Sequence, residues 1–264
     1  MMTKTKLLCV PFLLFCAASA SAADNRYSLT SERTDYSGSF GKRQETTVES
    51  TTGFGDTSFV VGVSHAKRDF NTDSFSALQL SGTVYHDWSD RLYTRSSVTA
   101  ASNKPVFATR EFAQDINYKI LSNTVVTVGG KYARYYGDRQ ARSLSVGGTQ
   151  YFGGGYVSYR YSAFDLGKLG RSHSHLATFR LKDGKGAGST QLWLGMGTAL
   201  HELQLQPGLS TGKSRGITLQ RVQPIKGPVA FNIAIGRAWY DTPAGKYHGT
   251  LASIGLTLTS RRIF

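Results

Sequence analysis

Hydrophobic and polar residues alternate with a period of two along most of the chain. Phe231, Ile233 and Ile235, for example, are interleaved with Asn232 and Gly236. A period of two places successive side chains on opposite faces of a strand. Helical periodicity is poor, and no later segment has enough consecutive apolar residues for a transmembrane helix. The pattern predicts an all-β protein.

The connections between the predicted strands alternate in length. About fourteen strands fit the pattern, and a count of twelve also fits it. Short turns are expected at residues 53–56, 89–91, 122–123, 153–154, 184–188 and 225–228. Longer loops are expected at residues 37–41, 69–74, 102–109, 137–140, 165–171, 201–213 and 241–246. This alternation is typical of a transmembrane up-and-down antiparallel β-barrel, with short turns on the periplasmic side, whereas a soluble sandwich has no reason to show it.

The N-terminus has the features of an export signal. Lys4 and Lys6 precede an apolar stretch, and Ala20 and Ala22 form a small-residue cleavage pattern. We therefore expect a cleaved signal peptide over residues 1–22 and a single barrel domain over residues 23–264, located in the outer membrane of a Gram-negative envelope. The terminal Phe264 is typical of barrels recognised by the assembly machinery, which we expect as a partner.

Composition narrows the chemistry. Both cysteines, Cys9 and Cys16, fall in the expected leader, so the exported chain has no disulfide and no thiol site. The formal charge of +14 falls to +12 without the leader, which predicts an acidic neighbour such as lipopolysaccharide phosphate in the surrounding lipid. Nucleic acid is not expected as a partner for an exported barrel. The excess basic residues are expected in loops, turns and rims, namely Lys42, Arg43, Lys67, Arg68, Arg139, Arg142, Arg171, Lys213 and Arg215.

Strand phase predicts a charged inner wall, because a charge facing lipid is costly near the membrane midplane. The expected lumen-lining residues are Glu32, Glu45, Glu49, Arg95, Glu111, Asp115, Lys119, Lys131, Arg160 and Arg180. Two arrangements fit these five acids and five bases. Segregated charges would create a transverse field across an open lumen, whereas paired charges would fill a closed interior.

Aromatic residues near predicted strand ends fit the girdles of a membrane barrel. They are Tyr27, Trp88, Tyr132, Tyr136, Trp239 and Tyr240.

Catalytic and metal sites are weakly indicated. Ser172 to His175, with His201 and Glu202 from another loop, is the best candidate for a hydrolase or acyltransferase site. In a strand, however, His173 and His175 lie on the face opposite to the serines. The same two histidines are a weak metal signal, and the triple glycine at residues 153–155 fits a hairpin. We expect no catalytic residues, metal or cofactor.

Several stretches of sequence resemble the YaiO-type outer-membrane β-barrel family across essentially the whole expected mature chain. They are residues 34–38 (TDYSG), 105–108 (PVFA), 112–117 (FAQDIN), 158–161 (SYRY), 190–194 (TQLWL), 219–224 (LQRVQP) and 239–243 (WYDTP). The resemblance implies a single barrel in the outer membrane and supplies no catalytic motif. Some relatives are linked with glycosyltransferases or exopolysaccharide production, which implies anionic glycans as candidate ligands.

Two features depart from the family pattern. The chain ends on the basic sequence Arg261-Arg262-Ile263-Phe264, and the loop from His201 to Lys213 is individual to this protein.

These observations predict a conduit or surface barrel with a charged lumen, associated with glycan handling. A lipid- or glycan-modifying barrel enzyme and a structural or adhesive barrel with a sealed lumen are the alternatives. The sequence does not identify a transported molecule.

Overall fold

The computed structural model contains fourteen long β-strands and two short 3-10 turns. It describes residues 25–70, 73–167, 170–184, 188–198, 212–225, 227–242 and 245–260. The strands are β1 (Asn25–Tyr36), β2 (Lys42–Phe54), β3 (Thr57–Asp69), β4 (Ser74–Asp87), β5 (Leu92–Ala101), β6 (Arg110–Leu121) and β7 (Thr124–Arg134). They continue with β8 (Gln140–Phe152), β9 (Gly155–Asp165), β10 (Arg171–Lys182), β11 (Ser189–Thr198), β12 (Lys213–Pro224), β13 (Val229–Thr242) and β14 (Gly245–Ser260).

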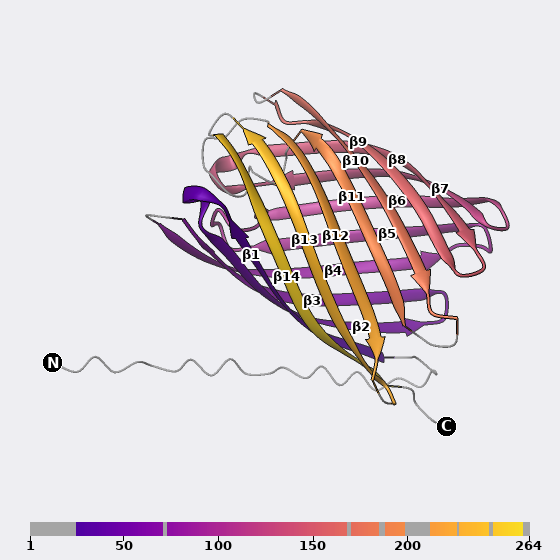
Figure 1. Ribbon diagram of the computed structural model, residues 1–264. Helices are drawn as coiled ribbons and strands as arrows, with labels where there is room; N and C mark the ends of the chain where they lie inside the picture. The colour runs from indigo at the N-terminus through magenta and orange to yellow at the C-terminus, as the bar shows by residue number, and fades with distance from the viewer. Residues whose placement is uncertain are drawn as a thin grey trace.

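The strands form one closed antiparallel barrel in which each strand pairs with its neighbours in sequence (Figure 1). β1 pairs with β14 from Asn25↔Ser260 to Tyr36↔Gly249, and this pairing closes the sheet. Closure leaves no unpaired sheet edge, which a strand-built protein in lipid requires. The predicted fold class and the count of fourteen strands are confirmed.

The outer wall is apolar and solvent-accessible. Large side chains on this face are about half exposed, as at Val61 (60%), Leu80 (56%) and Ile254 (54%). A soluble monomer rarely exposes so much contiguous apolar surface. Lipid therefore covers this band. No helix in the described part of the chain is long and apolar enough to cross a membrane.

The two ends of the barrel differ. One end, here called the turn end, carries Asn25, Ser260 and tight connections such as residues 55–56, 122–123 and 153–154. The other, the loop end, carries the connections at residues 37–41, 102–109 and 135–139. The predicted alternation of loops and turns is clear from β5 to β10, but the connections at residues 70–73 and 88–91 are equally long, and the expected loop at residues 241–246 lies mostly within β13 and β14. The expected signal peptide, Phe264 and most of the loop from His201 to Lys213 lie outside those residues.

The connection at residues 102–109 packs against the inner wall at the loop end. Val106 is fully buried, and Phe107 is 5% exposed. Both contact Ala66 and Ala77, which are Cα partners on β3 and β4 and leave room for them. A loop with so many buried apolar contacts is held in place by the hydrophobic effect.

Eight of the nine basic residues expected in loops, turns or rims lie within strands instead. They are Lys42 and Arg43 in β2, Lys67 and Arg68 in β3, Arg142 in β8, Arg171 in β10, and Lys213 and Arg215 in β12. β2 and β3 extend further toward the loop end than their polar residues suggested. Charged side chains that are paired or stacked on aromatic rings are compatible with a strand. The expected girdle residue Tyr240 is likewise misplaced, since it stacks on the buried Tyr247 at 4.7 Å between ring centroids.

Candidate functional site

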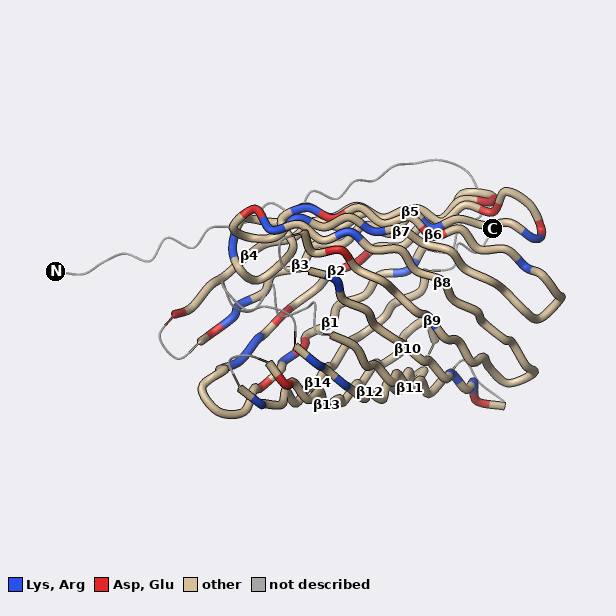
Figure 2. Tube along the Cα trace, turned by 90° about the horizontal axis from the view of Figure 1, so that it is seen from above, with Lys and Arg blue, Asp and Glu red and all other residues tan. Residues whose placement is uncertain are grey.

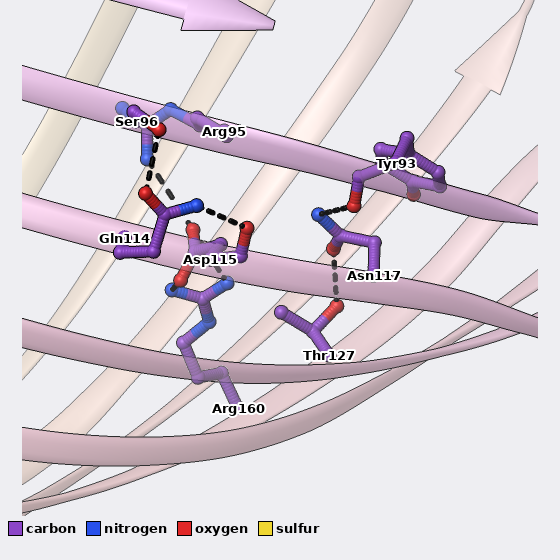
Figure 3. A network of polar contacts seen from close by, with 8 residues as sticks. All are labelled: Tyr93, Arg95, Ser96, Gln114, Asp115, Asn117, Thr127 and Arg160. Carbon is purple, nitrogen blue, oxygen red and sulfur yellow. Dashed lines mark hydrogen bonds and ion pairs between the residues drawn. The ribbon is translucent and has the colours of Figure 1, made fainter. Parts of the chain in front are cut away.

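The inner wall is organised around Asp115, in the middle of β6. Its side chain is 11% exposed and meets two guanidinium groups (Figure 3). Arg160 donates from Nη1 to Oδ1 at 3.2 Å and from Nη2 to Oδ2 at 3.3 Å. Arg95 places Nη1 3.5 Å from Oδ2. One carboxylate thus joins β5, β6 and β9.

The contact between β6 and β9 crosses two intervening strands, and glycines allow it. Gly129 on β7 is the Cα partner of Asp115, and a Cβ there would collide with Oδ1 of that carboxylate. Gly147 on β8 is the partner of Arg160, and a Cβ there would lie 2.8 Å from the backbone oxygen of Tyr159. Small residues at these positions let the arginine reach inward across the sheet.

Further polar pairs continue this layer on the same strands. Lys131 on β7 lies 2.7 Å from Glu111 on β6. Asn117 accepts a hydrogen bond from Thr127 at 2.7 Å (Figure 3). The bases are only partly covered, with Arg95 42% and Arg160 37% exposed, so water screens the ion pairs. These charges are paired, as in the second arrangement considered from the sequence, and do not segregate across the lumen.

The acids of β1 and β2 lie beside one another. Glu32 and Glu45 are Cα partners, and Arg43 places Nη2 2.6 Å from Glu45 Oε2. Glu49 is exposed, and its side chain lies beside Gly62 on β3. Arg43 therefore neutralises part of a negatively charged strip that sequence reasoning left without a base.

The two remaining predicted residues lie toward the turn end. Arg180 donates from Nη2 to Ser189 Oγ at 3.2 Å. Lys119 is half-buried and makes no ion pair with another described residue. All ten predicted residues occupy strand positions whose side chains point away from the exposed apolar face.

Sequence reasoning missed a second inner-wall cation, Arg68 at the loop end of β3. The residue is 1% exposed, and its guanidinium lies 4.3 Å from the ring centroid of Tyr36 and 4.4 Å from that of Phe70. It donates to the backbone oxygen of Phe40 at 2.7 Å. The signal was present in the sequence, since the alternation that puts Ser64 inside reaches Arg68 after two more steps.

The strands β11 to β14 form the opposite side of the barrel and carry a different inner surface (Figure 2). On their described inner positions there is no Asp, Glu, Lys, Arg or His. Many of these positions carry small residues, and larger side chains such as Trp193, Tyr240 and Leu251 lie among them. The small residues include Gly195, Gly197, Ser214, Gly216, Ala234, Gly236, Ala238, Gly249, Ser253 and Gly255. We refer to this surface as the small-residue wall, and to the inner face of β5 to β9 as the charged wall.

Space lies between these walls. A cavity of about 370 Å³ is bounded by Lys131 and Ser143 on one side and by Gly195, Gly216 and Ala238 on the other. A second cavity of about 200 Å³ lies between Glu32, Arg43 and the small-residue wall. Because glycine and alanine fill little volume, the barrel retains room at positions where larger side chains would pack.

The suspected catalytic cluster is not assembled in the described residues. Ser172 is buried and hydrogen-bonded to the Thr198 hydroxyl at 2.7 Å. His175 Nδ1 contacts the Tyr159 hydroxyl at 2.7 Å, on the outer wall. His201 and Glu202 lie outside the described residues, and no group of three potential metal ligands occurs within them.

Residues 24–202 match the YaiO membrane beta barrel domain. The chain belongs to the YaiO family. The match includes all ten predicted inner-wall residues and ends before β12, so the last three strands of this YaiO barrel, and the resemblances at residues 219–224 and 239–243, follow the matched region.

Solved structures share the barrel architecture at low sequence identity. The CymD monoaromatic hydrocarbon channel has a TM-score of 0.63 and 7% identity, covering 92% of this chain and 90% of its own. The Pseudomonas putida toluene transporter TodX has a TM-score of 0.57 and 10% identity, covering 91% and 90%. A bacterial polysaccharide outer membrane secretin has a TM-score of 0.53 and 12% identity, covering 91% and 99%.

These neighbours show the fold alone. Family and neighbours together support an outer-membrane location. Outer-membrane barrels have short periplasmic turns, which predicts that the turn end faces the periplasm and the loop end faces outward.

Proposed function

We propose that this YaiO-family barrel is a narrow outer-membrane channel for small polar solutes. The observation that carries the proposal is the pair of cavities between the charged wall and the small-residue wall. A barrel built to be sealed would fill this space with large side chains.

The inner charges would give the proposed channel a preference for anions. The ten predicted residues balance at five acids and five bases, and the structure adds Arg43 and Arg68 as two further cations. A narrow lumen with a small excess of bases favours anions over cations of the same size. Small anionic sugars are therefore the preferred solute class, in keeping with the glycan association that the family resemblance implies.

The packed loop at residues 102–109 narrows the outer mouth in this proposal. The guanidinium carbon of Arg43 lies over Phe107, 5.5 Å from the centroid of the phenyl ring. The loop thereby brings an apolar surface and a cation together at the entrance, where an anionic solute first meets the inner wall.

No catalytic activity is part of the proposal. Ser172 donates or accepts its hydrogen bonds with Thr198, and His173 and His175 lie on the other face of β10. A nucleophile and base that point to opposite faces cannot exchange a proton directly.

Solute efflux from proteoliposomes tests the channel. Vesicles containing the refolded chain would be loaded with glucuronate, glucose or glucosamine, which have similar size and opposite or no charge. We expect efflux in the order glucuronate, glucose, glucosamine, each faster than from protein-free vesicles. Efflux no faster than from protein-free vesicles would exclude the channel and favour the sealed structural barrel.

A further inference from the structure

Two arginines and a tryptophan form a cluster on the outer wall near the loop end. Arg215 lies on β12, and Arg237 and Trp239 lie on β13. The guanidinium carbon of Arg215 is 5.5 Å from the indole centroid, and that of Arg237 is 5.7 Å from it. All three side chains are exposed. The same indole ring thus attracts both cations through cation–π interactions.

The cluster sits at the boundary of the apolar band. Toward the turn end, the same outer faces of β12 and β13 carry Ile217, Leu219 and Ile235, all at least 41% exposed. Toward the loop end, the next outward residues are Lys213 and Asp241, which are Cα partners. Tryptophan is enriched where hydrocarbon meets lipid headgroups. The two guanidinium groups therefore lie at headgroup level.

Neither arginine has a carboxylate partner among the described residues. The nearby Asp241 lies 3.5 Å from Lys246 instead. Two other outer-wall cations, in contrast, are paired: Arg33 lies 2.8 Å from Asp35, and Lys67 lies 3.0 Å from Asp69. The Arg215–Arg237 pair is thus a local positive charge that the protein itself does not neutralise.

We propose that Arg215, Arg237 and Trp239 form a binding site for the phosphate group of an outer-leaflet glycolipid. Guanidinium groups bind phosphate oxygens in a bidentate manner, and two of them at one indole match the charge of a single dianionic group. The apolar side chains of Ile217 and Ile235 lie next to the site on the membrane side, where acyl chains of the same lipid would pack. This site does not depend on the channel.

The test compares two double variants of the full mature chain in neutral detergent, using native mass spectrometry to measure bound lipid. Arg215→Gln with Arg237→Gln removes the proposed site. Arg33→Gln with Arg221→Gln removes the same charge from outer-wall arginines that already have carboxylate partners. The probes are diphosphorylated lipid A, its dephosphorylated form, phosphatidylglycerol and inorganic phosphate.

We expect the first variant to bind diphosphorylated lipid A on the order of tenfold more weakly than the wild type, and the control variant to bind it equally well. Dephosphorylated lipid A should bind weakly to all three proteins. Arg215→Lys with Arg237→Lys should bind with intermediate affinity, because it keeps the charge without the bidentate geometry. Folding of each variant is checked by gel electrophoresis, in which a folded barrel migrates differently in unheated and heated samples.

Three results would overturn the assignment. The site variant and the control could bind lipid A equally well. Dephosphorylated lipid A could bind as tightly as the phosphorylated form, which would make acyl packing the whole attraction. Phosphatidylglycerol or inorganic phosphate could match lipid A in affinity and in sensitivity to the site variant, which would identify an ordinary phospholipid or a free anion as the ligand.

Discussion

The charged wall and the small-residue wall face each other across the barrel, and they differ in charge and in the volume of their side chains. On β5 to β9, each inner carboxylate has a basic partner, and Asp115 has two. On β11 to β14, the described inner positions carry no such charge, and glycine, alanine and serine leave space. The first wall supplies charge and rigidity, and the second supplies volume.

This contrast explains how one barrel can hold many ionisable residues and retain cavities. An unpaired charge in a low-dielectric interior is costly, so the charges gather where they can pair. Long paired side chains would fill a barrel of this size if they projected from every strand. Their absence from the described inner positions of β11 to β14 leaves lumen space against those strands.

Filling the small-residue wall should have the largest effect on function. Gly195→Phe places a ring into the cavity of about 370 Å³, where an added Cβ meets no atom within 4 Å. We expect a several-fold loss of single-channel conductance with the barrel still folded. The control is Gly82→Phe, whose added Cβ would contact Val98 on the lipid-facing side at 3.7 Å. Equal conductance in both variants would contradict the role given to this wall.

Neutralising the centre of the charged wall should have the next largest effect. Asp115→Asn leaves Arg95 and Arg160 without their carboxylate, so we expect a reversal potential shifted further toward anion selectivity. The free energy of unfolding should fall by about 1–3 kcal/mol, because both bases lose a charge-assisted partner. Reversal potentials under a salt gradient and urea unfolding in detergent measure the two effects.

The matched control for Asp115→Asn is Asp183→Asn, which makes the same charge change in the turn between β10 and β11. A similar change of selectivity in both variants would show that overall charge, and not the charged wall, sets the preference.

Releasing the loop at residues 102–109 should alter the mouth of the channel more modestly. Phe107→Ala removes a ring that is 5% exposed against Ala66 and Ala77. We expect a small rise in conductance with more frequent current fluctuations, and a stability loss of about 3–5 kcal/mol. Phe112→Ala, on the lipid-facing side of β6, should leave the current unchanged. Quieter or smaller currents in Phe107→Ala would contradict a narrowing role for the loop.

The smallest effect is expected at the turn end. Arg221 donates from Nη1 to Asp183 Oδ1 at 2.7 Å, and this hydrogen bond holds the pKa of the carboxyl below its ordinary value. A carboxyl whose pKa is lower in the folded state stabilises the fold at pH values above its unfolded-state pKa. This stabilisation is lost as the pH falls through the folded-state pKa.

Both partners of this ion pair are solvated, so Asp183→Asn should change the melting temperature at pH 7 very little. Any difference from the wild type should vanish in acid. A difference that grows as pH falls would contradict this sign.

Much of the fold could be predicted from the sequence because alternation and turn residues act locally. Gly153 and Gly154 form the predicted turn between β8 and β9, and Val61 faces lipid, as the alternation along β3 predicts. The same phase identified Asp115 and Arg160 as inner residues. It could not show that they meet, since the contact spans two strands and depends on Gly129 and Gly147. Non-local register decides such pairs.

Other errors have a similar origin. Arg43 and Arg68 were expected in rims because charge density near a loop suggests solvent, whereas Arg68 is buried by stacking on Tyr36 and Phe70. Tyr240 was expected in an outer girdle, but its position on β13 alternates to the inside. The inward packing of Val106 and Phe107 depends on the small Ala66 and Ala77, which are distant in sequence.

Single-channel recording of the refolded chain, residues 23–264, in a planar bilayer measures directly whether the lumen conducts ions. We expect stable unitary current steps with a reversal potential that indicates mild anion preference under a salt gradient. A barrel that is folded and inserted but carries no current, or one that prefers cations, would contradict it.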